Sequence, residues 1–230
     1  MRAMILAAGR GERMRPLTDH TPKPLLEVGG KPLIVWHLER LAAAGLRDIV
    51  INHAWLGSQI EARLGDGRTW GVRIQYSAEA SALETAGGIV QALPLLGREP
   101  FLVVNGDVWC DWDPAQAMPR AQALRAHGDQ AWLLLVDNPP QHPQGDFALA
   151  GERVAEAPAT HARLTYSGIG IYDPAMFAGL EAGVAAPLAP LMRAAMGRGQ
   201  VGGAHHPGRW TDVGTPERLA RLNDALRAAS

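Results

Sequence analysis

Short apolar runs alternate with amphipathic segments over the first two thirds of this 230-residue chain. The alternation is typical of β-α-β units, which build a mostly parallel sheet covered by helices on both faces. The run Phe101–Asn105 is apolar up to its last residue and is expected to be a buried strand. The expected strands are residues 2–8, 48–52, 72–77, 101–105, 131–136 and 166–172, and the expected helices are residues 32–44, 56–64, 84–93, 114–127 and 216–229. We therefore predict a doubly wound α/β fold.

A Pro- and Gly-rich stretch, Asn138–Gly145, interrupts this alternation and is expected to be a surface loop. The next segment, Phe147–Ala155, turns near Gly151 and predicts a hairpin, so the sheet is expected to carry a small β insertion. Because no stretch resembles a linker that would separate two independent domains, we predict a single domain over residues 1–230.

Positive and negative charges nearly balance, with 22 Lys and Arg against 23 Asp and Glu, so no overall field favours nucleic acid or an anionic membrane. The early apolar stretch Ala3–Ala8 is too short for a signal peptide, and we expect a cytoplasmic protein without a membrane span. The single cysteine, Cys110, is expected to be a structural free thiol. Two adjacent histidines, His205 and His206, have no carboxylate at ligand spacing, so we expect them to be structural or surface residues.

A segment rich in glycine and arginine, Leu6–Pro16, follows the first expected strand, where the carboxyl end of a parallel sheet usually opens into a ligand crevice. Gly9 and Gly11 let backbone N–H groups approach phosphate oxygens, and three arginines of the segment supply positive charge. A dinucleotide-binding motif is excluded because Met14 stands at its last glycine position, and no Gly-Lys-Ser/Thr follows as a P-loop requires. The segment predicts an anion cradle, although by itself it would also fit a tight turn with solvated arginines.

Lys23 lies between Pro22 and Pro24, which restrict its backbone before any ligand arrives. Exposed lysines more often serve solubility, but a lysine held in this way is a ready counter-charge for phosphate. We therefore predict that Lys23 belongs to the same anion site.

Asp107 follows the expected strand 101–105 and Gly106, so it should lie at the carboxyl edge of the sheet, with the glycine making room for a ligand. Mg²⁺ prefers oxygen ligands, commonly one or two carboxylates together with phosphates and water. Asp212 lies just before the last expected helix, and its position alone favours an ordinary loop or capping role.

Together these segments resemble the sugar-1-phosphate nucleotidyltransferase family, whose signature L-A-A-G-x-G-x-R-x-x-P-L-T followed by P-K-P-L is matched at residues 6–18 and 22–25. The family's late motif W-x-D-x-G-T-P is matched at residues 210–216. The resemblance implies a Rossmann-like nucleotidyltransferase fold, with a nucleotide-binding half at about residues 1–110 and a sugar-binding and closing half at about residues 111–230. It also implies two small-molecule substrates, a nucleoside triphosphate and a sugar 1-phosphate, and Mg²⁺ as the cofactor.

The same resemblance assigns roles to individual residues. It implies Lys23, Arg13 and Asp107 as catalytic residues, and Asp107 and Asp212 as metal ligands. The implied nucleotide-binding residues are Leu6, Ala7, Ala8, Gly9, Gly11, Arg13, Lys23, Glu79, Thr85 and Gly87. The implied sugar-binding residues are Asn105, Glu156, Ser167 and Gly168. Thr85 would equally fit a plain helix cap, and the family lysine after Glu156 is replaced by Ala157, with Arg163 as a candidate substitute.

The nucleophile of such a reaction is a phosphate oxygen whose second pKa is about 6, so no general base is needed. The sugar phosphate would attack the α-phosphorus in line and pyrophosphate would leave, while Mg²⁺, Lys23 and Arg13 stabilise the developing charge.

Nearly the whole chain resembles one subfamily, the N-acetylmuramate 1-phosphate uridylyltransferases of cell-wall recycling, through residues 51–57, 105–109 and 166–169. This implies UTP and N-acetylmuramate 1-phosphate as substrates. We expect a monomer or small homo-oligomer. Because Ser77–Ser81 lacks the Gly and Pro expected there, transfer of a thymidylyl, uridylyl or guanylyl group to a hexose 1-phosphate stays an alternative. A non-catalytic nucleotide-sugar sensor is a further alternative, although such a relative would be expected to have lost a phosphate or metal residue.

Overall fold

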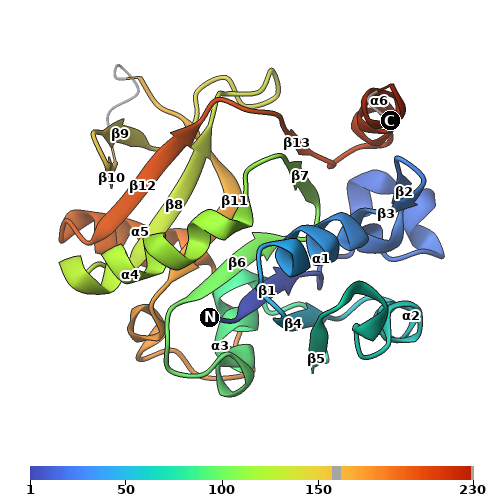
Figure 1. The fold of residues 1–230 in the computed structure, drawn as a ribbon, viewed down its shortest axis with the longest axis horizontal. Helices are drawn as coiled ribbons and strands as arrows, with labels where there is room; N and C mark the ends of the chain where they lie inside the picture. The colour runs from blue at the N-terminus through green and yellow to red at the C-terminus, as the bar shows by residue number, and fades with distance from the viewer. Residues whose placement is uncertain (157–161, 229–230) are drawn as a thin grey trace.

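The computed structural model describes residues 1–156 and 162–228, and in this part of the chain a nine-stranded sheet forms the centre of the fold (Figure 1). The strands of this sheet are β1 (Ala3–Leu6), β4 (Asp48–His53), β5 (Arg73–Ala78), β6 (Phe101–Asn105), β8 (Ala131–Val136), β9 (Ala148–Ala150), β10 (Arg153–Ala155), β11 (Thr165–Tyr172) and β12 (Val201–His206). Two short ribbons stand beside it, formed by β2 (Glu27–Val28) with β3 (Lys31–Pro32) and by β7 (Val108–Cys110) with β13 (Trp210–Asp212). The α-helices are α1 (Leu33–Ala43), α2 (Gly57–Leu64), α3 (Glu84–Leu96), α4 (Ala117–His127), α5 (Leu188–Gly197) and α6 (Pro216–Arg227).

The order of the main sheet is β5-β4-β1-β6-β11-β8-β12-β10-β9. Four neighbouring pairs are parallel and four are antiparallel, and seven of the nine strands point the same way because only β11 and β10 are reversed. The predicted doubly wound, mostly parallel α/β fold is therefore confirmed. The predicted small insertion is the β9/β10 hairpin at one edge of the sheet.

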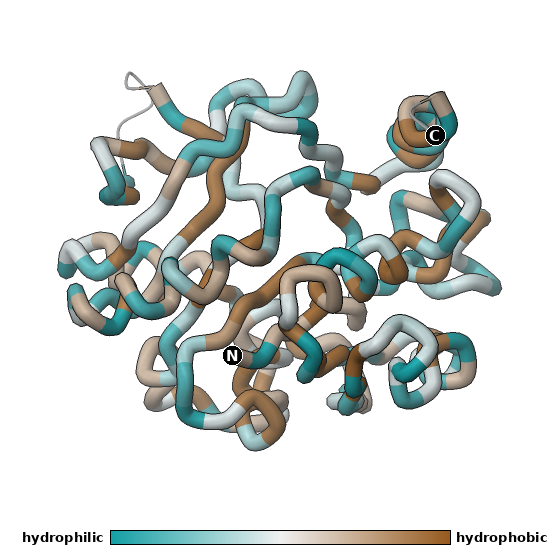
Figure 2. Tube along the Cα trace, viewed as in Figure 1, coloured by the Kyte–Doolittle hydropathy of each residue, from teal (hydrophilic) through white to brown (hydrophobic). Residues whose placement is uncertain are grey.

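Successive residues of the central strands face opposite sides of the sheet and feed two different apolar cores. In β1, Ala3 and Ile5 belong to the core beneath α1 and α4, whereas Met4 belongs to the core beneath α3 and α5. Figure 2 shows the resulting distribution, with brown apolar segments along the central strands and teal polar segments on the outside. These strands read as continuous apolar runs because both of their faces are covered.

A third apolar cluster fastens the last helix to the N-terminal half. Its buried members are Met14, Leu26, Val28, Leu33, Trp109, Val213, Leu222 and Leu226. Helix α6 consequently lies beside β2, as the red helix near the label C in Figure 1 shows. Thr215 caps this helix as predicted, since its Oγ1 accepts a hydrogen bond from the Arg218 N–H at 3.4 Å.

The sequence patterns did not predict strand β12 (Val201–His206) or helix α5 (Leu188–Gly197). Strand β12 contains two glycines and two histidines, which have little preference for strands, and it is held by parallel pairing with β8. Helix α5 has Pro190 in its first turn and lies in a stretch rich in Ala, Gly and Pro. Among the described helices, none combines the length and the apolar character that crossing a membrane requires.

Candidate active site

The chain runs from β1 outward to β4 and β5, then returns to the other side of β1 with β6. The carboxyl ends of β1 and β6 therefore form a topological switch point, where doubly wound sheets bind their ligands. A cavity of about 450 Å³ opens at this edge. It is lined by most of the predicted nucleotide-binding residues, namely Leu6, Ala7, Ala8, Gly9, Gly11, Arg13, Lys23 and Thr85, together with Asn105 and Asp107.

The two glycines of the loop after β1 serve different purposes. Gly11 has a left-handed backbone with a φ of 68°, and a Cβ there would lie 3.1 Å from the Thr18 methyl group and 3.2 Å from the Lys23 Cβ. Thr18 Oγ1 holds this turn by donating a hydrogen bond to the Gly11 carbonyl at 2.8 Å. At Gly9 a Cβ would meet no protein atom within 4 Å, so the fold itself does not require glycine at this position. The open space at Gly9 belongs to the cavity and leaves room for a ligand near the backbone.

Lys23 is buried in the wall of the cavity, in the short helical turn η3 (Lys23–Leu25). Its Nζ donates to Asp107 Oδ2 at 2.6 Å, and the exposed fractions of the two side chains are 8% and 38%. A charge-assisted hydrogen bond of this length fixes the ammonium group at the carboxyl end of β6. Lys23 and Asp107, which the sequence assigned to the anion site and to the metal site, are thus in direct contact.

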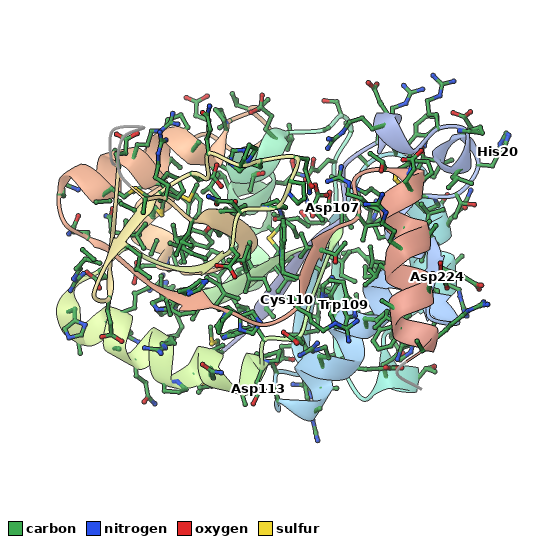
Figure 3. All side chains as sticks on the ribbon, turned by 90° about the horizontal axis from the view of Figure 1, so that it is seen from above. His20, Asp107, Trp109, Cys110, Asp113 and Asp224 are labelled. Atoms are coloured by element: carbon green, nitrogen blue, oxygen red, sulfur yellow. The ribbon has the colours of Figure 1, made fainter. Side chains whose placement is uncertain are left out.

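A second cavity, of about 290 Å³, adjoins the first one on the β11 side of the sheet. The two cavities share Arg13, Asn105 and Asp107 in their linings. Figure 3 shows Asp107 near the middle of the molecule, with α6 to one side. The site therefore has two compartments that meet at one carboxylate and one arginine.

Asp212 comes to this junction through the β7/β13 ribbon, in which Asp212 pairs with Val108. The Val213 N–H donates to the Asp107 carbonyl at 2.9 Å, so the two aspartates stand on adjacent backbone segments. Asp212 Oδ2 accepts a hydrogen bond from Arg218 Nη1 at 2.6 Å. Each carboxylate thus has a cationic partner, Lys23 or Arg218.

These two carboxylates have the chemistry and the exposure expected of ligands for a divalent cation. Both side chains are partly exposed, Asp107 at 38% and Asp212 at 26%, and both line the second cavity. Hard divalent cations take carboxylate oxygens as ligands, and the ion pairs present here show that both groups attract positive charge. The two aspartates could therefore hold such an ion in the second compartment, which both of them line.

The family model for nucleotidyl transferases matches residues 2–229. The chain belongs to the nucleotidyl transferase family. Members of this family generally use a divalent metal ion, which agrees with the carboxylate pair.

Individual relatives agree with this assignment. The chain is 60% identical to the N-acetylmuramate alpha-1-phosphate uridylyltransferase of Neisseria meningitidis serogroup B, over 100% of this chain and 98% of that protein. It is 37% identical to the protein of the same name from Caulobacter vibrioides, over 99% of this chain and 96% of that protein. The mannose-1-phosphate guanyltransferase of Aspergillus fumigatus is 33% identical over 94% of this chain, which spans 62% of that longer protein.

A solved structure shows the same architecture. A Bacillus anthracis protein assigned as a glucose-1-phosphate thymidylyltransferase, in complex with sucrose, superimposes with a TM-score of 0.86 at 25% identity, covering 99% of this chain and 95% of that one. The predicted enzyme class, a sugar-1-phosphate nucleotidyltransferase, is confirmed by these relatives and the family match.

Two predicted nucleotide-binding residues of this nucleotidyl transferase lie behind the wall of the first cavity. Glu79 is buried, and its carboxylate accepts hydrogen bonds from Asn52 Nδ2 at 2.6 Å and from the Leu83 N–H at 2.9 Å. Asn52 Oδ1 in turn accepts from the Ala7 N–H at 2.9 Å. Glu79 therefore positions the end of β1 through Asn52 and has no oxygen left without a partner.

Gly87, the other of these two residues, is a packing position. A Cβ there would lie 2.4 Å from the Val184 carbonyl oxygen, so glycine allows α3 to approach residues 184–186. Its neighbour Glu84, which lines the first cavity, has a left-handed backbone with a φ of 58°, unusual for a non-glycine residue. Thr85 also lines that cavity and makes no side-chain cap, so the alternative of plain helix capping does not apply to it.

The predicted sugar-binding residues are divided in a similar way. Asn105 and Gly168 line the second cavity, and a Cβ on Gly168, whose φ is 79°, would lie 2.7 Å from Asn105 Nδ2. Ser167 belongs to the same wall but is fully buried, and its Oγ accepts a hydrogen bond from the Ile169 N–H at 3.1 Å. Glu156 is exposed, pairs with Arg193 at 2.8 Å, and lines neither compartment.

The missing family lysine corresponds to Ala157, which lies outside the described residues. Its candidate substitute, Arg163, is half-buried and lines neither compartment among the described residues.

Gly106 has a different purpose from the one expected. A Cβ at this position would lie 2.6 Å from the Leu6 carbonyl oxygen, to which the Gly106 N–H donates at 2.8 Å. The glycine therefore makes room for the backbone of β1 and not for a ligand.

Sequence reasoning missed most of the second compartment. Pro139, Gln141, His142, Tyr166 and Trp210 line it, and Trp210 Nε1 donates to the Ser167 carbonyl at 2.9 Å. These residues come from three distant segments with no shared motif. The resemblance at 210–216 pointed to Asp212 alone.

The histidines also have a carboxylate neighbour that the spacing did not reveal. His206 Nε2 lies 2.6 Å from Asp111 Oδ1, and the side chains of His206, Asp111 and Cys110 come within 4.8 Å of one another. Burial raises the pKa of Cys110 to about 11, so its thiol stays protonated at neutral pH. The structural roles predicted for Cys110 and His206 agree with this arrangement.

Proposed function

We propose that this enzyme transfers a uridylyl group from UTP to N-acetylmuramate 1-phosphate, with release of pyrophosphate. The observation that carries the proposal is the pair of adjoining compartments that share Arg13, Asn105 and Asp107. A transferase that joins two phosphates needs both substrates in contact at one point, with positive charge beside the reacting phosphorus. The choice of UTP and N-acetylmuramate 1-phosphate rests on the relatives of Neisseria meningitidis and Caulobacter vibrioides, which carry this activity in their names.

In this proposal the triphosphate lies along the loop between Gly9 and Gly11, where the backbone is open to the first compartment. Arg13 and Lys23 provide the positive charge next to the phosphates, and Arg13 reaches both compartments. Lys23 is already held in place by Asp107, so its ammonium group loses little side-chain entropy when a phosphate binds.

The sugar 1-phosphate occupies the second compartment, and one of its phosphate oxygens attacks the α-phosphorus of UTP. This oxygen is anionic at neutral pH, because the second pKa of a phosphate monoester is about 6, so no side chain has to remove a proton. Asp107 and Asp212 would hold Mg²⁺ at the junction, and the ion supplies neutralisation of phosphate charge when bound. The protein contributes position and charge, without a covalent intermediate.

The same substrates support a role in recycling cell-wall sugars in the cytoplasm, where nucleoside triphosphates are available. We propose a monomer or small homo-oligomer that acts on small molecules and not on nucleic acid, as the balanced charge suggests.

The substrate proposal is tested with a panel of triphosphates and sugar phosphates, using pyrophosphate release as the readout. We expect UTP with N-acetylmuramate 1-phosphate to give the highest kcat/KM. Equal or higher values with glucose 1-phosphate or mannose 1-phosphate and any triphosphate would show that the proposed substrates are wrong. Nucleotide binding without pyrophosphate release in any combination would instead identify a sensor.

The metal proposal is tested separately. We expect chelation to abolish turnover and added Mg²⁺ to restore it, and we expect Asp212→Ala to abolish turnover while the protein stays folded. Full activity of the Asp212→Ala variant would remove the two-carboxylate arrangement. Asp224→Ala on α6 is a matched control, because this exposed aspartate lines neither compartment among the described residues.

A further inference from the structure

A third cavity, of about 430 Å³, lies between the start of α6, strand β13 and the loop around residues 139–141. Three arginines line it, Arg209, Arg218 and Arg221, whereas Asp212 is the single acidic residue in its described lining. A lining with this excess of positive charge is suited to an anionic group.

Two of the three arginines are available for such a group. Arg218 is engaged by Asp212 at 2.6 Å, and this pair leaves no excess charge. Arg209 and Arg221 form no ion pair at contact distance among the described residues, and both are exposed, although the charge of Arg221 also acts on the Glu217 carboxylate of the same helix. The guanidinium carbon of Arg209 lies 5.1 Å from the centre of the Trp109 ring, a cation–π contact that limits the freedom of its side chain.

This arginine cavity is continuous with the second compartment of the active site. Both are lined by Pro139, Gln141, Trp210 and Asp212. Trp210 is held in the shared wall by the hydrogen bond from its Nε1 to the Ser167 carbonyl at 2.9 Å. A substituent on a sugar in the second compartment would therefore reach Arg209 and Arg221 by extending past Trp210.

We propose that Arg209 and Arg221 bind a carboxylate that is carried by the sugar substrate. The inference rests on the proposed function, because N-acetylmuramate 1-phosphate has a carboxylate on its lactyl ether. N-acetylglucosamine 1-phosphate has the same ring and acetamido group but no carboxylate. A guanidinium binds a carboxylate through two parallel N–H···O bonds, so this cavity selects an acidic sugar by attraction and leaves neutral sugars without the contact.

The test compares these two sugar phosphates with saturating UTP, in the wild-type enzyme and in the double variant Arg209→Gln/Arg221→Gln. A charged hydrogen bond is worth about 1.5–3 kcal/mol, which corresponds to a loss of roughly 10- to 100-fold. We expect kcat/KM for N-acetylmuramate 1-phosphate to fall by this factor, mainly through KM. The value for N-acetylglucosamine 1-phosphate should change far less, so the ratio of the two values is the readout. Arg218 is left unchanged, because it contacts Asp212.

Arg227→Gln is the matched control, since this exposed arginine lies on the same helix but outside the cavity lining. Arg227→Gln should keep the wild-type ratio of the two kcat/KM values. If the double variant does not fold, the test is repeated with the single variants Arg209→Gln and Arg221→Gln. Equal losses for both sugars, or an unchanged ratio, would overturn the inference and leave the proposed function intact. A wild-type enzyme that does not use N-acetylmuramate 1-phosphate would overturn the proposed function itself.

Discussion

Replacing Asp107 by Asn tests the junction of the two compartments most directly. The substitution keeps the shape of the side chain but removes the negative charge that Lys23 Nζ contacts at 2.6 Å. Lys23 is 8% exposed at its side chain, so its ammonium group would stay in the wall without a counter-charge. A hydrogen bond to a charged group contributes about 1.5–3 kcal/mol, and partial exposure of Asp107 at 38% places the expected loss of folding stability near the lower end, at about 1–2 kcal/mol.

The double variant Lys23→Met/Asp107→Asn separates this loss from other effects. Because the methionine carries no charge, the amide at position 107 no longer faces an unpaired ammonium group. We expect the double variant to be more stable than the sum of the single variants by about 1–2 kcal/mol, as measured by urea unfolding at constant pH. Additive losses would show that the two side chains do not interact in solution.

Turnover gives the second readout of the same variants. Asp107 is proposed to hold Mg²⁺ and Lys23 to contact phosphate. We therefore expect kcat to fall at least about 100-fold in Asp107→Asn and in Lys23→Met. The double variant should regain stability but not activity, because it lacks both groups. Asp224→Asn is the control for the charge change, and full turnover of Asp107→Asn would refute the proposed role of this carboxylate.

Three further predictions follow from local features of the fold. Burial lowers the pKa of His37 from 6.5 to about 4, so between these values the unfolded chain binds more protons than the folded one. The free energy of unfolding should therefore fall by about 2 kcal/mol from pH 7 to pH 5 through this residue, and His37→Gln should remove that part of the slope in urea titrations. Gly168→Ala should lower the free energy of unfolding by about 1–2 kcal/mol, because alanine is strained at a φ of 79° and its Cβ would displace Asn105. The KM for the sugar phosphate should also rise, and an unchanged KM would contradict this contact. Glu84→Gly should be more stable than Glu84→Ala by about 1 kcal/mol in thermal unfolding, because glycine relieves the left-handed backbone, and equal stabilities would show that position 84 is not strained.

Much of the nucleotide side could be predicted from the sequence because its signals are local. The apolar run that ends at Asn105 defines a buried strand, and the residue that follows such a strand lies at the carboxyl edge of the sheet. The loop from Gly9 to Gly11 and the proline-flanked Lys23 lie close together in the chain, and a Cβ on Gly11 would lie 3.2 Å from the Lys23 Cβ. Placing Asp107 near the glycine loop required one further inference, that β1 and β6 are neighbours. This strand order is expected for a doubly wound sheet.

Other parts of the site depend on contacts that local patterns do not encode. Glu79 is an acidic residue near the nucleotide side in the sequence, yet its two carboxylate oxygens are used by Asn52 and the Leu83 N–H, so it supports the wall. Glu156 lies on the exposed side and pairs with Arg193. Whether a polar side chain faces a cavity or braces it depends on which partners the packing brings within hydrogen-bond distance.

The sequence by itself thus determined the sheet type, the glycine loop and the lysine, since these follow from apolar periodicity and from residues adjacent in the chain. Local patterns did not place Asp212 beside Asp107, which the family resemblance implied and the tertiary structure shows, and only the tertiary structure decided that Arg209 borders the sugar side. Both depend on the pairing of β7 with β13, two three-residue strands from opposite halves of the chain. Strands this short carry too little pattern to reveal their partner, and Trp109 and Val213 at this ribbon are buried in the cluster that also holds Leu222 and Leu226 of α6.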